Sequence, residues 1–307
     1  MRGLSTQFIE ELKNGILSKI LLLVKNDSTM CLEIRDNYIN IYYRGGNILR
    51  IKEKNGRYTA HFDIKYLDSE TTRISEDLPG VLNDVLEVDK WVMNIPFLKN
   101  EMDLWFGKNP KSEREFQQLV ARENNQDSSA KGTDYFILDI EYANSEGRFD
   151  MIAVHWPSNG AARKNNKELS LAFIEMKYGD SALAGSAGLT KHIKDMNNFL
   201  KESDNLNTIK KEMKQVFNQK LELGLINNQH MIESFKDAKP EYIFILANHD
   251  PDSTILWREL QLMKDDSAYM EIKFAVSNFM GYGLYEKNIY NLNDFSMRFK
   301  DQIRCKS

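Results

Sequence analysis

Three charged residues interrupt two apolar segments of the sequence. Asp150 lies near the start of the apolar run of residues 149–154, and Glu175 and Lys177 lie within the largely apolar residues 171–178. Residues two apart in a β-strand point to one face, so Glu175 and Lys177 share a face if this segment is a strand. Asp150 stands across from them if the two segments are neighbouring strands. Buried charges are costly unless they are paired or hold a metal ion, so these residues predict a polar site in an apolar sheet.

The chemistry of such a site is that of a hard divalent cation. Two carboxylates and a carbonyl oxygen suit Mg²⁺ or Mn²⁺, and Mg²⁺ keeps several of its waters. The lysine can orient or help deprotonate one of those waters and can stabilise charge on a pentavalent phosphorus. The alternative is an exposed cross-strand salt bridge, worth under about 1 kcal/mol. Strands that are apolar on both faces disfavour this alternative.

The acid-x-lysine spacing alone is not specific, because it recurs elsewhere. The other pairs are Glu11/Lys13, Asp63/Lys65, Glu212/Lys214, Asp237/Lys239 and Glu271/Lys273. Two of them fall in helical sequence, where residues two apart do not share a face, and one falls in a turn. Asp63/Lys65 and Glu271/Lys273 fall in expected strands, but neither follows a hairpin strand that carries an acid inside an apolar run.

The elements around the three residues predict a mixed central sheet flanked by helices. Residues 112–124 have a helical spacing, and Asn-Ser-Glu-Gly at 144–147 is typical of a tight turn between antiparallel strands. The expected strands cover residues 135–142, 149–156, 169–178, 242–247 and 270–276, and the expected helices cover 189–200, further sequence to about 235, and a segment from about 253. Strands and helices in this order indicate an α/β core.

The N-terminal region predicts a small β-rich domain over residues 1–105, followed by the α/β domain over 106–307. A helical spacing at 3–14 precedes expected strands at 30–34, 38–43, 48–52 and 58–66, and the intervening Asp36-Asn37, Gly45-Gly46 and Asn55-Gly56 are typical of hairpin turns. A helix over 82–104, interrupted by Pro96, is expected to close the domain. We interpret the aromatic residues Trp91, Phe97, Trp105 and Phe106 as interdomain core rather than as a base-stacking platform.

The set of Asp150, Glu175 and Lys177 with these elements resembles the PD-(D/E)xK, restriction-endonuclease-like nuclease superfamily. The resemblance covers roughly residues 111–276, and Phe149 stands where the proline of the family motif would be. Residues 42–47 also resemble bacterial proteins of this kind. The resemblance implies that Asp150, Glu175 and the Met176 carbonyl bind the metal ion and that Lys177 is the catalytic lysine. The leading helix of the family often adds a glutamate; of Glu113, Glu115 and Glu123 we favour Glu115, beside the apolar face.

Nucleic acid, with DNA favoured, is the partner that the resemblance implies. Relatives place a polar residue on the helix after the third strand, so Lys191 or His192 is expected to contact the scissile phosphate, unless this is an ordinary surface helix. The basic loop with Arg163, Lys164 and Lys167 is expected to grip phosphates, or else to be a solvated loop. Two further hypotheses stay open: a nuclease-like fold that binds or scaffolds without turnover, and a functional role for residues 1–105 in recognising a partner.

Composition excludes several other classes of protein. The 307 residues carry a formal net charge of −4, which excludes a histone-like polycation, and only two cysteines, which excludes a disulfide framework. The sequence contains no GxxxxGK[ST], GxSxG or HExxH motif. Its apolar stretch at 16–24 is shorter than the roughly 18 residues of a spanning helix. We therefore expect a cytoplasmic protein without a membrane segment, and the oligomeric state, a homodimer included, stays open.

Overall fold

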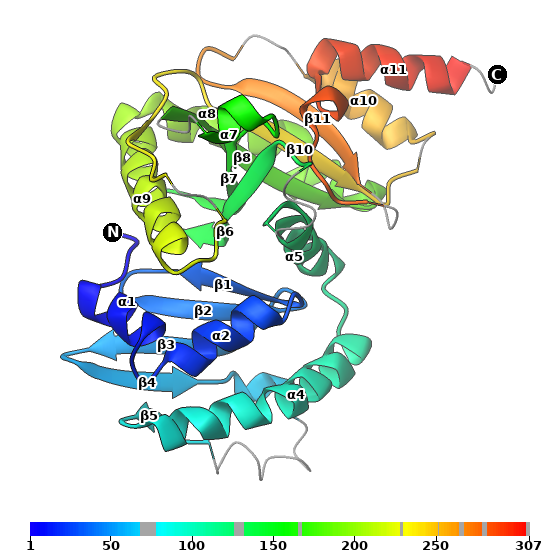
Figure 1. Cartoon of the computed structure of the whole chain (residues 1–307). Coiled ribbons are helices and arrows are strands. Elements are labelled where there is room, and N and C mark those ends of the chain that lie inside the picture. Colours follow the sequence, from blue (N-terminus) through cyan, green and yellow to red (C-terminus); the bar gives the residue numbers. More distant parts are fainter. Residues whose placement is uncertain are drawn as a thin grey trace. The chain divides into compact units, whose positions relative to one another are not determined.

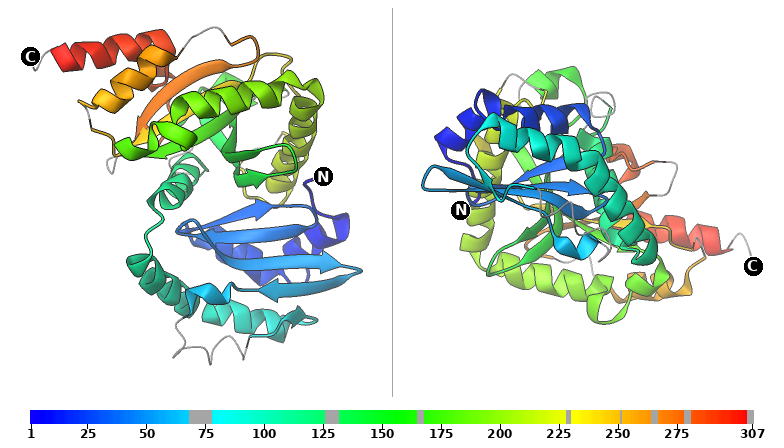
Figure 2. Two further views of the ribbon diagram at one scale, coloured as in Figure 1. Left: turned by 180° about the vertical axis from the view of Figure 1, so that it is seen from behind. Right: turned by 90° about the horizontal axis from the view of Figure 1, so that it is seen from below.

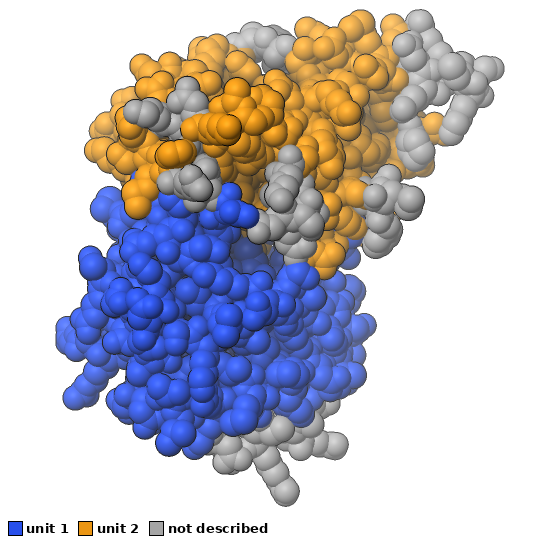
Figure 3. Space-filling model, in the orientation of Figure 1, with its two compact units in different colours: residues 1–118, 215–229 blue, residues 119–214, 230–307 orange. Residues whose placement is uncertain are grey.

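The computed structural model describes residues 1–67, 78–125, 132–164, 168–227, 230–250, 252–263, 267–277 and 281–304 (Figure 1). These form a mixed α/β structure with two sheets. The chain divides into two compact units (Figure 3), of which unit 1 comprises Met1–Gln118 with Gln215–Gln229 and unit 2 comprises Leu119–Lys214 with His230–Ser307. No helix in the described ranges combines the length and the apolar character needed to cross a bilayer.

Unit 1 is built on an antiparallel sheet whose hairpins follow the turn residues of the sequence. The strands, in the order β1-β2-β3-β4-β5, are β1 (Met30–Ile34), β2 (Tyr38–Tyr43), β3 (Gly46–Lys54), β4 (Arg57–His61) and β5 (Val81–Leu82). The predicted hairpins β1–β2, β2–β3 and β3–β4 are confirmed. Asn55 and Gly56 have φ values of 56° and 74°, as a two-residue hairpin turn requires. The expected strand at 58–66 ends earlier, at His61, and a short 3-10 helix, η1 (Ile64–Tyr66), follows.

Helices α1 (Thr6–Lys13), α2 (Ser18–Asn26) and α4 (Val85–Lys108) complete the N-terminal part of unit 1. The prediction that Pro96 interrupts the third of these helices is wrong, because α4 continues through it. Proline inside a helix removes one backbone hydrogen bond, at a cost of about 3 kcal/mol. Pro96 itself is exposed. The apolar face of α4 offsets the loss by burying the residues Val88, Trp91, Ile95, Leu98, Met102 and Phe106.

Residues 215–229 belong to unit 1 although they are distant in sequence. The backbone N–H of Leu4 donates to the side-chain oxygen of Gln219 at 2.9 Å, and the Gln219 amide donates to the Leu4 carbonyl at 2.8 Å. Lys220 forms a buried ion pair of 2.8 Å with Glu33. The expected boundary at residues 105/106 falls inside α4, whereas the compact unit extends to Gln118 and takes up this distant segment.

Unit 2 contains the expected mixed sheet. Its strands, in the order β12-β11-β10-β8-β7-β6 with β9 paired to β8, are β6 (Tyr135–Ala143), β7 (Arg148–His155), β8 (Glu168–Tyr178), β9 (Ser234–Phe235), β10 (Glu241–Ala247), β11 (Glu271–Ser277) and β12 (Tyr290–Asn291). Strands β6, β7 and β8 pair antiparallel, and β10 pairs parallel to both β8 and β11. Strand β10 is buried along its whole length. The prediction that helical sequence continues to Phe235 is wrong, because Ser234 and Phe235 form β9.

Helices cover this sheet. They are α5 (Ser112–Asn125) and α9 (Ser203–Glu222), each of which contains a unit boundary, and α7 (Gly160–Lys164), α8 (Leu189–Lys201), α10 (Thr254–Leu262) and α11 (Leu292–Arg304). Helices α10 and α11 lie side by side (Figure 2), and α11 stacks Phe295 on Phe274 of β11. Helix α8 packs Phe199 against Phe173 of β8. Helices α8 and α11 therefore lie on the face of the sheet to which Glu175 points. Phe173 is two residues before Glu175 on β8, and Phe274 pairs with Phe244, which itself pairs with Glu175.

Candidate active site

The structure places Asp150 beside the Glu-x-Lys segment, as the sequence predicts. Strands β7 and β8 are antiparallel neighbours with Met151 opposite Ile174. The Asp150 side chain accepts a hydrogen bond of 2.8 Å from the backbone N–H of Met176. This bond fixes the Asp150 carboxylate next to the peptide that joins Glu175 to Met176.

Glu175 and Lys177 form a buried ion pair. The Lys177 Nζ lies 2.9 Å from Glu175 Oε1, and the two residues are 3% and 5% exposed, respectively. The alternative of an exposed cross-strand salt bridge is therefore wrong. Removing two charges from water has a desolvation penalty that one ion pair does not reliably offset. The buried Glu175–Lys177 pair is therefore consistent with a functional role rather than a stabilising one.

His192 adds a third polar group to the pair. It lies in the first turn of α8, and its Nδ1 is 3.2 Å from Glu175 Oε1. Burial, followed by the positive charge of Lys177, lowers the pKa of His192 to about 4. The imidazole is therefore neutral at pH 7, and its contact with Glu175 is not an ion pair under those conditions.

The charges of both carboxylates act on the pKa of Tyr242, a residue of β10. It is 2% exposed, and burial raises the pKa of its hydroxyl well above the usual value, with the negative charges of Glu175, Asp150 and Asp195 adding to the effect. The strand register gives the same arrangement independently, because Met151 pairs with Ile174 and Asp150 therefore lies opposite Glu175.

The donor set suits magnesium better than a metal that needs many side-chain ligands. Within the described ranges, no group of three or more His, Cys, Asp or Glu side chains could hold a metal ion. Mg²⁺ needs only one or two carboxylates, because it retains waters, whereas structural zinc takes four protein ligands. Asp150 and Glu175 supply that number of carboxylates, and their binding of an ion together with the Met176 carbonyl stays a prediction.

Glu115 has a different partner from the one expected. It lies in the part of α5 that belongs to unit 1, where its carboxylate accepts from Arg44 Nε at 3.1 Å and from Nη2 at 3.0 Å. Arg44 also pairs with Asp103 at 3.0 Å. The structure thus gives Glu115 a place in an Arg44 cluster, and its role as a catalytic glutamate stays a prediction.

The expected phosphate-binding residues differ in their surroundings. Arg163 donates to the Thr133 carbonyl at 2.6 Å and lies over the Trp156 ring at 4.3 Å; burial lowers its pKa. Lys164 is exposed at the end of α7, and Lys167 lies outside the described residues. Lys191 is exposed and forms an ion pair with Asp195 one turn along α8. Of the members of this group that the structure describes, His192 is the one with a contact to Glu175.

A second cluster of the same residue types lies in unit 2 and was not singled out by the sequence. Glu241, which is 5% exposed, has Oε1 2.9 Å from His155 Nδ1 and 3.0 Å from Lys273 Nζ. The Tyr135 hydroxyl donates to its other oxygen at 2.5 Å. The four residues come from four strands, so no local spacing reveals them. A glutamate directly before the apolar run 242–247 was the available signal.

Two acids on β6 also lie near the site strands. Asp139, opposite Ile152 of β7, is fully buried. Glu141 has a φ of 53°, an unusual backbone conformation for a non-glycine residue, and lies between the pairs Ile140–Met151 and Tyr142–Phe149.

Comparisons with protein-family models, with curated proteins and with solved structures found no match to this chain.

Proposed function

We propose that this protein is a magnesium-dependent phosphodiesterase that hydrolyses nucleic acid, with DNA as the favoured substrate, on a core of the restriction-endonuclease-like type. One observation carries the proposal. The buried carboxylate of Glu175 on β8 contacts Lys177 and His192, and the Asp150 carboxylate on β7 accepts a hydrogen bond from the backbone N–H of Met176, the residue after Glu175.

The residues of this chain have separable roles in the proposed reaction. Bound Mg²⁺ supplies polarisation of the phosphate and a lowered pKa of an attacking water. Asp150 and Glu175 hold and orient the ion. Lys177, held by Glu175, provides a positive charge that stabilises the negative charge developing on phosphorus. His192 is neutral at pH 7 and can therefore accept a proton there.

A cleavage assay with matched lysine variants tests the proposal. Purified protein is incubated with plasmid DNA in Mg²⁺ or Mn²⁺, with EDTA as the metal-free arm. Lys177→Met is expected to lower the rate by about 100-fold or more. Lys273→Met removes the other strand lysine that contacts a buried glutamate and is expected to leave the rate unchanged. Circular dichroism checks that both variants fold.

Two results would contradict the proposal. One is cleavage that persists in EDTA, and the other is equal loss of activity in the two lysine variants. Parallel incubation with single-stranded RNA decides between the two kinds of nucleic acid.

A nuclease-like fold without turnover is the second candidate, because Lys177 already occupies one oxygen of Glu175. This candidate predicts that neither DNA nor RNA is cleaved in Mn²⁺. It also predicts that Mn²⁺ does not raise the melting temperature. A metal ion that binds only the folded state must raise it, and in that case Asp150→Ala should abolish the rise.

A further inference from the structure

The outer side of α4, opposite the side that is buried in unit 1, carries large apolar residues. Leu86, Met93 and Leu104 are 72%, 70% and 58% exposed, and Phe97 between them is half-buried. Each of the other helices that the structure describes contributes at most one residue to the exposed large apolar side chains. A helix that is apolar on both sides is typical of one that packs against neighbours on both sides.

The residues on this outer side recur at alternating intervals of four and three. Those that form this series, which we call the outer stripe of α4, are Leu86, Lys90, Met93, Phe97, Asn100 and Leu104. The intervals are those of the a and d positions of a coiled coil, along which one helix packs on another. The stripe extends over about 27 Å, since each helical residue adds about 1.5 Å. It therefore has the pattern of a seam for a second helix rather than of scattered exposed side chains.

The sequence that directly precedes β5 and α4 does not match this seam. Residues 68–77 lie outside the described residues, and they read Asp-Ser-Glu-Thr-Thr-Arg-Ile-Ser-Glu-Asp. One large apolar residue among ten cannot pair with the four of the stripe. A helix from another molecule is the better match.

The outer stripe is complementary to itself in the antiparallel direction. When Met93 of one copy faces Phe97 of a second copy, Leu86 of the first faces Leu104 of the second. Both pairs join an a position to a d position, as in antiparallel coiled coils. Each pair also occurs twice, related by a two-fold axis, which is the symmetry of most homodimers. The stripe thus supplies both halves of a closed contact.

The charged residue of the stripe, Lys90, favours the antiparallel direction. In that alignment the exposed Lys90 lies opposite Asn100 of the second copy, and Asp103, three residues further along the same helix, lies next to Asn100. The Asp103 side chain is 45% exposed although it pairs with Arg44, so its negative charge is accessible to an ammonium. A parallel alignment would instead place Lys90 against Lys90 of the second copy. Polar residues in such a seam fix direction and register.

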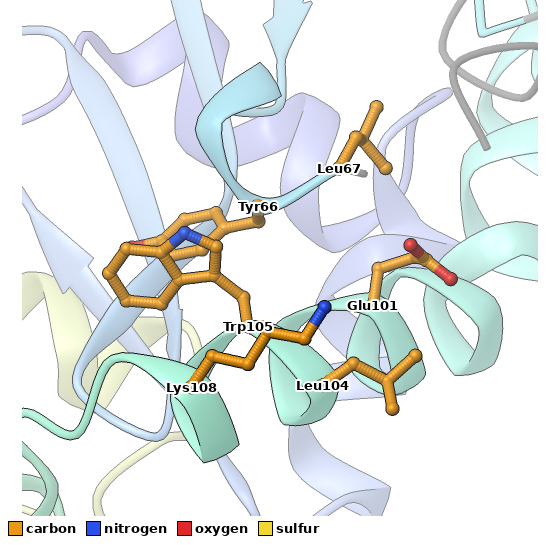
Figure 4. A pocket seen from close by; sticks show the side chains of 6 residues that line it. All are labelled: Tyr66, Leu67, Glu101, Leu104, Trp105 and Lys108. Carbon is orange, nitrogen blue, oxygen red and sulfur yellow. The ribbon is translucent and has the colours of Figure 1, made fainter. Parts of the chain in front are cut away.

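A cavity at the C-terminal end of the stripe can receive a side chain of the second copy. Leu104 lines this cavity, which has a volume of about 240 Å³ (Figure 4). The other lining residues are Tyr66, Leu67, Glu101, Trp105 and Lys108. Because Leu86 of the second copy lies opposite Leu104, its side chain would enter the cavity beside Leu67 and Leu104. The two-fold axis gives the same contact at both ends of the helix pair.

We propose that the outer stripe of α4 binds the outer stripe of a second copy of this chain, as an antiparallel helix pair, and that the protein forms a homodimer through unit 1. The inference does not rest on the proposed reaction, because it uses neither the metal ion nor nucleic acid.

The first test is the mass of the full chain in solution, measured by sedimentation equilibrium over a range of protein concentrations. We expect the mass to rise with concentration towards about twice the 35.7 kDa of one chain. Met93→Glu places a charge in the seam and is expected to weaken association by about 10-fold or more. Met297→Glu is the matched control, since Met297 is 58% exposed on α11, and it should leave association unchanged.

The second test is the direction of the helix pair. Chains with Cys31 and Cys305 replaced by serine carry either Leu86→Cys or Leu104→Cys. The antiparallel pair predicts a disulfide between the two kinds of chain when they are mixed. It predicts none when either kind is oxidised alone, because like positions are about 27 Å apart.

Four outcomes would overturn the inference. They are a monomer at every concentration, equal association of Met93→Glu and Met297→Glu, no disulfide in the mixture, and a disulfide that Leu86→Cys forms with itself. Circular dichroism checks that the variants fold. Both methionines are exposed in the single chain and glutamate is a good helix former, so neither substitution is expected to unfold it.

Discussion

Glu175 and Glu241 lie in the same sheet with the same kinds of partner, yet their surroundings differ. Each is buried and contacts one lysine and one histidine. Register places them on opposite faces, because Phe244 aligns with Glu175 and Glu241 is three residues before Phe244. Residue types and contacts within a cluster therefore do not by themselves identify a reactive site.

The Glu241 carboxylate is held firmly by its cluster. Burial alone would raise the pKa of Glu241, but hydrogen bonding and charge from His155, the Tyr135 hydroxyl and Lys273 outweigh it and lower the pKa to about 2. Donors reach both of its oxygens. Such a carboxylate stays ionised and acts as a structural anchor between strands.

Position along the strands is the difference between the two clusters. Glu241 begins β10, whereas Glu175 lies three residues before the end of β8, to which β10 is parallel. Ligands of α/β sheets bind outside the carboxyl ends of the strands. Each glutamate has a further acid on an adjoining strand, Asp150 beside Glu175 and Glu271 beside Glu241, so this feature does not separate them. This comparison favours Glu175 as the reactive cluster and Glu241 as the structural one.

Cleavage activity should separate the two clusters most strongly. Glu175→Gln removes a proposed metal ligand and is expected to lower the rate of DNA cleavage by about 100-fold or more. Glu241→Gln, assayed at a temperature at which it is folded, should retain the rate of the natural protein. Initial rates on plasmid DNA measure both, and equal losses would remove the distinction between the clusters.

Stability should fall when either cluster is broken. Glu241→Ala leaves Lys273 and His155 without their shared carboxylate, and breaking a buried pair in this way typically costs about 3–5 kcal/mol. Glu175→Ala should cost as much, because it leaves the buried Lys177 without its carboxylate. Urea unfolding followed by circular dichroism gives the free energy of unfolding, and a loss below about 1 kcal/mol in Glu241→Ala would show that Glu241 is not an anchor.

Acid should destabilise the protein through Glu241. Its pKa is lowered from 4.5 to about 2 in the folded state, so its contribution is fully present above pH 4.5 and is lost as the pH falls towards 2. The shift corresponds to about 3 kcal/mol. Unfolding free energies measured from pH 6 to pH 3 should fall less in Glu241→Gln than in the natural protein. Parallel curves would contradict the assignment.

His192 should produce a smaller effect in the same direction. Its pKa is about 4 in the folded state against 6.5 for the free side chain, so the unfolded chain takes up a proton first as the pH falls through 6.5. This reduces stability by on the order of 1 kcal/mol at pH 5, after allowance for partial exposure. His192→Gln should remove that dependence. His155→Gln is the comparison variant from the other cluster.

Features that depend on residues close together in the sequence could be predicted from the sequence. Asn55 and Gly56 both adopt positive φ, so their hairpin follows from residue type. The turn at 144–147 joins β6 to β7, and alternation along β8 places Glu175 and Lys177 on one face. For these reasons the strands that carry the candidate site were predicted in their correct order.

Features that depend on distant residues were not predictable. The continuation of α4 through Pro96 depends on an apolar face that packs on the sheet of unit 1. The helix position of Glu115 favours it as a catalytic glutamate, which stays a prediction, but its contact with Arg44, 71 positions away, could not be predicted. The Glu241 cluster draws on four strands. A one-dimensional pattern contains no information on such long-range partners.

The return of residues 215–229 to unit 1 determines how this protein can be made and dissected. During synthesis, Glu33 and the backbone of Leu4 must wait for Lys220 and Gln219 to leave the ribosome before they find their partners. An N-terminal fragment cut at residue 105 or 118 would lack Lys220, the buried partner of Glu33, and would be prone to aggregate. Genetic truncation is thus a poor means of assigning roles to the two halves, and point substitution in the intact polypeptide is the appropriate one.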